Sequence, residues 1–170
     1  MESWPDSRPQ SEAGARNIAH GHFNHSAVRT LGRFAFGEFG AEGDVVEICN
    51  EAYIAAPTTP NDEAWRPKWP EAVTPLRQTG AGAWRLELFH GPSLSFKDVA
   101  MQLIGPLFDV ALKRRDQRLS VVCATSGDTG GAAVEAMKGR ERIDLFVLTP
   151  KGRVSEVQRR FMTASGASNV

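Results

Sequence analysis

The residue of this sequence best suited to nucleophilic chemistry is Lys97. A reactive lysine needs partial burial and a fixed position, because its neutral amine is the nucleophile. Lys97 opens an apolar helical pattern directly after a Gly91-Pro92 loop, where the positive end of the helix disfavours the ammonium form. Position alone also fits a lysine that points into water, as most lysines do. The other lysines occupy a proline-rich arm, helix ends or a polar loop: Lys68, Lys113, Lys138 and Lys151.

A glycine-rich turn, Ser126–Gly131, is the second candidate site. It follows a continuous apolar run and precedes a helical pattern. Backbone N–H groups at such a helix start can bind anions, and ligands of open parallel sheets lie at the carboxyl ends of strands. The turn lacks the GxxxxGK[ST] pattern of phosphate-binding loops, and Asp128 would repel an anion. It also fits a plain strand-to-helix connection capped by Asp128 or Thr129, so both interpretations stay open.

Two other groups of side chains could bind ligands. His90 opens the loop before the candidate lysine, and it either lines the same site or packs within the loop. Arg153 could bind a phosphate, although exposed loop arginines are the commoner case. His20, His22 and His25 lie close together, but no cysteine or acidic cluster accompanies them, so no metal site is predicted.

The second half of the chain alternates between strand and helix patterns. Strands are expected at 84–89, 119–125 and 143–148, and helices at 96–114, from the glycine-rich turn to Gly139, and at 155–162. The pairs Ser95 and Asp98, and Ser155 and Gln158, have the spacing of capping boxes. Pro106 lies inside the first helix and favours a kink there. This alternation predicts an α/β fold, a parallel sheet with helices on both faces.

The first half has no sustained apolar periodicity. We expect residues 1–70 to be an irregular or mobile, poorly ordered N-terminal region and residues 71–170 to be a partial domain truncated at the C-terminus. Prolines with Trp65 and Trp69 between them predict an extended arm over 57–75. The apolar group that begins at Val45 fits a strand or a helix.

Composition limits the class of protein. Hydrophobic residues make up 41% of the chain, and 20 basic residues balance 20 acidic ones, which argues against a nucleic-acid binder. No apolar run approaches the roughly 20 residues of a membrane-spanning helix, and the start does not read as a secretory signal. Two cysteines, Cys49 and Cys123, cannot form a disulfide framework, so a cytoplasmic location is expected.

Three ordered motifs resemble threonine synthases. Leu86–Asp98, LELFHGPSLSFKD, resembles the segment that carries the cofactor lysine of that family. Ala124–Gly130, ATSGDTG, resembles the next signature, and Lys151–Gln158, KGRVSEVQ, resembles a third. The resemblance runs from about Glu71 to the end of the chain. It favours the functional interpretations of the lysine and of the glycine-rich turn.

The resemblance implies the amino-terminal part of a pyridoxal-phosphate enzyme, with a partial three-layer domain of the tryptophan-synthase-β fold group. Threonine synthases are lyases of amino-acid biosynthesis that convert O-phospho-L-homoserine and water to L-threonine and phosphate. Lys97 matches the Schiff-base lysine, which later moves protons, and Asp128 and Ser126 match cofactor contacts. The substrate contacts implied by the resemblance are Ser126, Gly127, Thr129, His90 and Arg153.

The sequence also departs from the family. The family's phosphate-cradling loop and the residue facing the pyridine nitrogen come after the point where this chain ends, so we expect no activity from the chain alone. Pro106 is unexpected in its helix. One alternative is a related lyase such as a threonine dehydratase. Another is an inactive fragment that acts as an interaction module, because a sheet edge after Val147 would invite strand pairing. The oligomeric state is not predicted.

Overall fold

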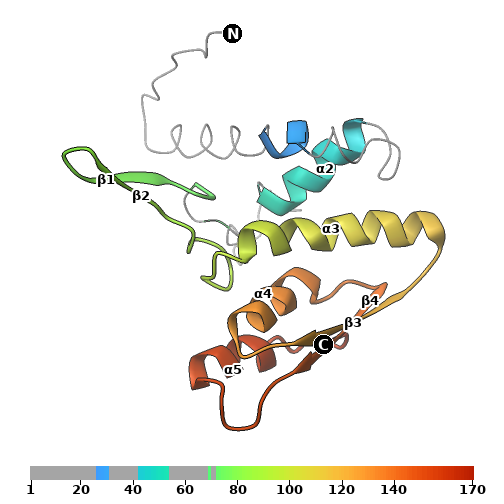
Figure 1. Ribbon diagram of the computed structural model, residues 1–170. Helices are drawn as coiled ribbons and strands as arrows, with labels where there is room; N and C mark the ends of the chain where they lie inside the picture. Colours follow the sequence, from blue (N-terminus) through green and yellow to red (C-terminus); the bar gives the residue numbers. More distant parts are fainter. Residues whose placement is uncertain (1–25, 31–41, 54–68, 70–71) are drawn as a thin grey trace, which may run out of the picture.

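The computed structural model describes residues 26–30, 42–53, 69 and 72–170 (Figure 1). Residues 26–30 are helical. The further elements are α2 (Glu42–Tyr53), β1 (Leu76–Gly80), β2 (Ala83–Leu86), α3 (Asp98–Arg115), β3 (Leu119–Ala124), α4 (Asp128–Met137), β4 (Ile143–Leu148) and α5 (Glu156–Thr163). None of the described helices is both long and apolar enough to cross a membrane.

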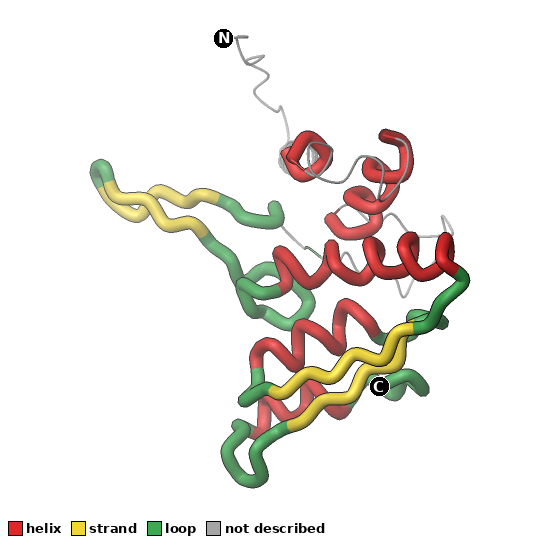
Figure 2. Tube along the Cα trace, turned by 45° about the vertical axis from the view of Figure 1, so that its right-hand side comes forward, coloured by secondary structure: helices red, strands yellow, loops and turns green. Residues whose placement is uncertain are grey.

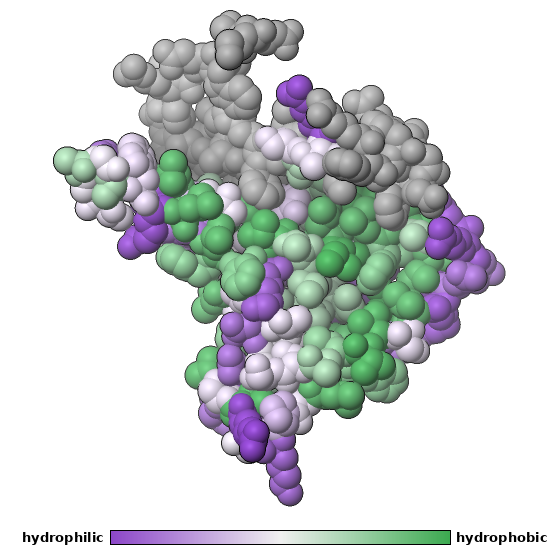
Figure 3. Space-filling view, in the orientation of Figure 1, coloured by the Kyte–Doolittle hydropathy of each residue, from purple (hydrophilic) through white to green (hydrophobic). Residues whose placement is uncertain are grey.

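Strands β3 and β4 form a parallel pair, with Leu119 opposite Ile143 and Ala124 opposite Leu148. Helix α4 lies against one face of the pair and α5 packs on α4 (Figure 2). The α/β class and the parallel pairing are confirmed. Among the described residues, helices cover only this one face. The other face exposes the large apolar side chains of Val122, Phe146 and Leu148, and apolar residues gather there in Figure 3.

Strand β2 lies outside the parallel pair. The strand expected at 84–89 forms only over Ala83–Leu86, and it pairs antiparallel with β1 as a hairpin that projects from the body (Figures 1 and 2). The connection between the strands holds Gly82 at a φ of +73°, a left-handed conformation that glycine adopts without steric cost. This local turn directs the segment back to β1, so it does not supply a third parallel strand.

Helix α3 is the longest element and the centre of the packing. It runs through the buried Pro106 and ends where Asp116 adopts a left-handed φ of +47°. The close approach of α3 to α4 depends on Gly105, since a Cβ at this position would lie 2.5 Å from the Ala136 carbonyl oxygen. The main core lies between α3, α4 and the sheet, and its buried members are Leu112, Ala133, Val134, Ala136, Met137, Ile143, Leu145 and Met162.

A second, smaller cluster joins α2 to the other side of α3. The apolar group that begins at Val45 forms a helix, and Ala52 and Tyr53 at its end are buried with Trp69 and Val73. The Trp69 indole donates a hydrogen bond to the Ala52 carbonyl at 3.0 Å. The other residues of the proline-rich arm up to 71 lie outside the described residues. The division of the chain near residue 70 stays a prediction. Helix α2, which precedes this boundary, packs against α3, which follows it.

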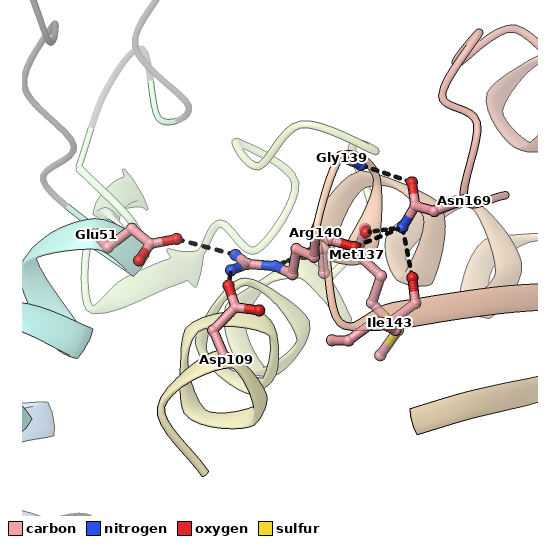
Figure 4. A network of polar contacts seen from close by, with 8 residues as sticks. Glu51, Asp109, Met137, Gly139, Arg140, Ile143 and Asn169 are labelled. Carbon is pink, nitrogen blue, oxygen red and sulfur yellow. Dashed lines mark hydrogen bonds and ion pairs between the residues drawn. The ribbon is translucent and has the colours of Figure 1, made fainter. Parts of the chain in front are cut away.

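Arg140 links three elements near the end of α4 (Figure 4). Its guanidinium donates to the Ala136 carbonyl at 2.6 Å and to Glu51 of α2 at 3.0 Å, and it pairs with Asp109 of α3. Only 12% of the Arg140 side chain is exposed. Because the charge is largely buried, its ion pairs with Glu51 and Asp109 offset the cost of removing it from water.

Asn169 stabilises the connection between α4 and β4 (Figure 4). Its amide nitrogen donates to the carbonyls of Met137 at 2.9 Å and Ile143 at 2.8 Å, with a longer contact to that of Arg140. Its amide oxygen accepts from the Gly139 N–H at 2.8 Å. The Asn169 backbone carbonyl accepts from the Leu145 N–H at 2.8 Å, which places the residue beside β4.

Replacing Asn169 should therefore destabilise the whole α4–β4 unit. We expect Asn169→Ala to lower the free energy of unfolding by about 1 to 3 kcal/mol, because several backbone groups lose their partner. Urea unfolding followed by circular dichroism measures this change. The neighbouring exposed Ser168 provides the control, and Ser168→Ala should leave the unfolding midpoint in place. Equal midpoints for the two variants would contradict the role given to the amide.

Candidate active site

Lys97 lies in the turn that leads into α3 and is neither free in solvent nor deeply buried. Its side chain is 26% exposed, and its Nζ atom lies 4.3 Å from the centroid of the Phe96 ring. The same Nζ atom lies 3.9 Å from Oδ2 of Asp128, at the start of α4. The structure thus brings together Lys97 of the first motif and Asp128 of the second.

The position of Lys97 depends on the next residue, Asp98. This carboxylate has no solvent exposure, and it accepts the Ser93 N–H at 2.8 Å and the Ser93 hydroxyl at 2.7 Å. Burial raises the pKa of Asp98, while the hydrogen bonds from Ser93 and the Ser95 backbone act against that rise. The two bonds between Ser93 and Asp98 close the loop that precedes α3. Gly91 lies so close to the Asp98 side chain that a Cβ at position 91 would clash with it.

The capping box expected from Ser95 and Asp98 is incomplete, because Lys97 and not Ser95 is the N-cap of α3 and no side chain caps the helix there. Helix α3 begins at Asp98, later than predicted, because the three residues before it make tighter turn bonds, such as that from the Asp98 N–H to the Ser95 carbonyl at 3.0 Å. The Ser95 hydroxyl instead lies 3.4 Å from the Lys97 N–H. The Asp98 side chain turns back to Ser93, a contact across the loop that residue spacing did not reveal.

Exposed apolar side chains surround the lysine turn. Phe89, Leu94 and Phe96 are each about half exposed or more, which is unusual for residues of this size in one loop. Leu94 has a φ of +60°, and a non-glycine residue in this region costs about 1 to 3 kcal/mol. The loop thus holds a strained, apolar edge beside the amine.

The second motif forms the turn between β3 and α4. The N-cap residue of α4 is Gly127, which has a φ of +155° and no side chain with which to cap the helix. The predicted cap by Asp128 or Thr129 is therefore wrong, because both residues lie inside the helix. The Thr125 hydroxyl instead accepts N–H groups from Gly127 at 3.1 Å and Gly130 at 3.2 Å. Ser126 is exposed and Thr129 is half-buried. The role of Thr125 was missed because its side chain acts across the turn.

The third motif contacts the second. The predicted capping box is confirmed, because the Ser155 hydroxyl accepts the Gln158 N–H at 3.3 Å. The Gln158 side chain then extends from α5 to α4, where its Nε2 atom donates to Oδ1 of Asp128 at 2.7 Å. One carboxylate thus lies between a lysine on one side and an amide on the other.

His90 and Arg153 make no contact with Lys97 in the part of the chain that the structure describes. The His90 ring bonds to Glu87 at 2.9 Å and stacks on Phe89, with ring centroids 4.8 Å apart. Hydrogen bonds from Arg85 and then His90 hold the pKa of Glu87 below its usual range. Arg153 is exposed in the loop between β4 and α5.

No metal-ligating cluster occurs among the described residues. The three histidines at 20, 22 and 25 lie outside them. The prediction that they bind no metal therefore stays a prediction.

Comparisons with known proteins agree on one family. A threonine synthase from Pseudomonas aeruginosa is 51% identical over 148 residues, 87% of this chain and 29% of that protein. The crystal structure of a threonine synthase with bound pyridoxal phosphate from Brucella melitensis superposes with a TM-score of 0.75 at 44% identity, over 98% of this chain and 33% of that one. The chain is homologous to threonine synthases. The resemblance of the three motifs is thereby confirmed.

The homology extends over nearly the whole chain but over a minor part of each relative. A threonine synthase from Methylobacillus glycogenes is 32% identical over 170 residues, 98% of this chain and 34% of that protein. The yeast threonine synthase structure superposes with a TM-score of 0.66 over 83% of this chain. The chain spans about a third of the length of the relatives it matches. No family model matches the sequence.

The buried carboxylate before α3 can be tested by substitution. Asp98→Ala should lower the free energy of unfolding by about 2 to 4 kcal/mol, because the Ser93 N–H and hydroxyl both lose their partner. Asp98→Asn should cost less, since an amide can still accept the N–H and donate to the hydroxyl. Chemical unfolding of the three proteins measures both changes. An alanine variant as stable as the asparagine variant would contradict this role.

The same pair also predicts a pH dependence. Because the pKa of Asp98 is raised in the folded state, the folded protein retains a proton that the unfolded chain has released above the ordinary value of 3.8. The stability of the wild-type protein, relative to Asp98→Asn, should therefore fall as the pH rises from 3.8 through the raised pKa. Unfolding curves of both proteins across this range measure the difference. A difference that grows with pH would contradict the burial effect.

Proposed function

We propose that this chain is the part of a threonine synthase that carries the reactive lysine. The reaction is the pyridoxal-phosphate-dependent conversion of O-phospho-L-homoserine and water to L-threonine and phosphate. The observation that carries the proposal is the approach of Lys97 to Asp128 across two consecutive motif-bearing turns. The 44% identity to a threonine synthase crystallised with pyridoxal phosphate, over 98% of this chain, supports it.

The residues at this position fit such a cofactor. The Lys97 amine is partly exposed, and its nearest carboxylate is 3.9 Å away, so no close ion pair from the described residues occupies it. When bound, pyridoxal phosphate supplies an aldehyde for an amine and a ring that withdraws electrons from the reacting carbon. The half-exposed apolar side chains of Phe89, Leu94 and Phe96 can exclude water from a ring that lies against them.

The chain's own residues then divide the work. Lys97 would hold the cofactor through its amine, and its Nζ atom can take up and return a proton. Asp128 lies beside that amine. Ser126, Gly127 and Thr129 stand at the start of α4, where the positive end of the helix suits the substrate carboxylate.

Two further residues have smaller roles in the proposal. Arg153 is exposed and is a candidate contact for the substrate phosphate. His90 is committed to Glu87, so we assign it to the support of the loop around the substrate.

The proposal extends to a cytoplasmic location and to a small-molecule partner. Cys49 and Cys123 are free thiols, which supports a reducing, cytoplasmic location. A net charge of zero supports a small-molecule partner over a nucleic acid.

Covalent trapping tests the assignment of the lysine. The chain is incubated with pyridoxal phosphate, reduced with borohydride and digested, and the labelled peptide is identified by mass spectrometry. We expect saturable labelling confined to Lys97, since among the described lysines that amine lies beside both the Phe96 ring and the Asp128 carboxylate. Lys97→Ala should abolish the label, whereas Lys113→Ala, at an exposed site, should retain it. Labelling spread over all five lysines would refute the assignment.

Turnover separates the proposal from its alternatives. With phosphohomoserine and threonine offered in parallel, a threonine synthase releases phosphate and a threonine dehydratase releases a keto acid. Because this chain spans about a third of its relatives, we expect it to bind pyridoxal phosphate without turnover, and the protein in its complete form to release phosphate. Keto-acid release by the complete form would favour the dehydratase. Threonine formation by the 170-residue chain alone would refute the expected inactivity.

A further inference from the structure

The two oxygens of the Asp128 carboxylate face different residues. Oδ1 accepts a 2.7 Å hydrogen bond from the Gln158 amide, while Oδ2 lies 3.9 Å from the Lys97 amine. The Asp128 side chain is 54% exposed, so the surrounding side chains do not fix its orientation. The hydrogen bond from Gln158 is the interaction that fixes it.

The orientation of the Gln158 amide is itself determined by Ser155. The Ser155 hydroxyl accepts the Gln158 backbone N–H at 3.3 Å, and it lies 3.0 Å from the Gln158 Oε1 atom. A hydroxyl has one proton to donate, and Oε1 is an acceptor, so this proton points to Oε1. The amide NH₂ must then face Asp128. The capping box of α5 therefore sets the direction of a bond to α4.

The Gln158 amide packs closely on the backbone of Gly127. A Cβ on Gly127 would lie 2.3 Å from Cδ, 2.5 Å from Nε2 and 2.6 Å from Oε1 of Gln158. The amide thus lies directly on the turn that precedes Asp128, in space that the absent side chain of Gly127 leaves open.

We propose that Gln158 is a positioning residue that keeps Asp128 from closing on Lys97. At 3.9 Å the carboxylate attracts the amine without a direct hydrogen bond. A carboxylate released from Gln158 can rotate to about 2.8 Å from the amine, a typical charge-assisted hydrogen-bond distance. That ion pair favours the ammonium form, which is not nucleophilic. Gln158 of α5 thus preserves the reactivity of an amine in the turn before α3.

Other carboxylates on the surrounding elements have partners of their own. These pairs are Glu87 with Arg85 and His90, Asp98 with Ser93, Glu135 with Lys138, and Glu156 with Arg159 and Arg160. Asp128 is the carboxylate within 4 Å of Lys97 among the described residues, so a change in Gln158 acts on Lys97 through it.

The inference adds to the proposed function, but its test uses no cofactor, so the two can fail separately. Each protein is labelled with a trace of acetic anhydride over a range of pH, and the extent of Lys97 acetylation is measured by mass spectrometry. We expect Gln158→Leu to raise the pH of half-maximal labelling by about half a unit, from the Coulomb energy of a carboxylate that moves closer. Gln158→Glu should raise it further, because two carboxylates repel.

A second substitution shows whether the effect passes through Asp128. Asp128→Asn should lower the midpoint, and adding Gln158→Leu to it should cause no further shift. Gln117→Leu makes the same change at an exposed glutamine and should leave the midpoint in place. The exposed Lys113 and Lys151 serve as references in every sample. Circular dichroism verifies that each variant is folded, and Gln158→Glu provides the answer if Gln158→Leu unfolds.

The possible results are distinct. An upward shift in the Gln158 variants that disappears in the Asp128→Asn background supports the inference. An unchanged midpoint in both Gln158 variants, or an equal shift in the Asp128→Asn background, overturns it. Borohydride trapping at Lys97 that survives either result would leave the proposed function intact.

Discussion

A carboxylate with no exposure to solvent, that of Asp98, sets the geometry on which the site depends. It binds both the backbone and the side chain of Ser93 while its own backbone enters α3. The loop and the helix therefore form one rigid unit, because separating them would leave buried polar groups without partners. Lys97 is the last residue before this junction. Its backbone is fixed by the next residue, and its side chain lies over the Phe96 ring with Nζ near Asp128.

Close helix packing brings the second motif to the first. Gly105 of α3 allows the backbone of α4 to approach, and on the other side of α4, Gly130 leaves room for Met162 of α5. Helix α4 can then contact α3, α5 and one face of β3–β4 at the same time. The carboxylate at the start of α4 falls between the lysine before α3 and the amide in α5. Small residues far from the amine thus determine the distances around it.

Periodicity in the sequence was enough to predict α3, α4, α5, β3 and β4, since each of these depends on a local apolar pattern and its end signals. The hairpin was not predicted, because its pairing depends on a turn whose backbone only glycine adopts readily. Helix α2 was undecided, since few apolar residues mark it and its burial comes from α3. Asp98 was assigned to a cap by spacing alone, whereas its partner lies across a loop.

The residues of the candidate site could be predicted from the sequence, whereas the contacts between them could not. Lys97 and the turn at Ser126 were selected from their position in the chain and from the family resemblance, but nothing in their spacing showed that Asp128 faces the amine. Ser155 and Gln158 had the spacing of a cap, and they form one. The cap uses only the hydroxyl and a backbone N–H, so the second bond of Gln158, which crosses between helices, had no signal in the sequence.

The contact between Gly127 and Gln158 also constrains how this protein can change over generations. A side chain at position 127 would occupy the space of the Gln158 amide, and it would also have to adopt a φ of +155°, which residues other than glycine rarely do. A smaller residue at 158 would remove the first obstacle, together with the bond to Asp128, but not the second. Glycine is therefore required at position 127 for two separate reasons, one of which lies in another helix.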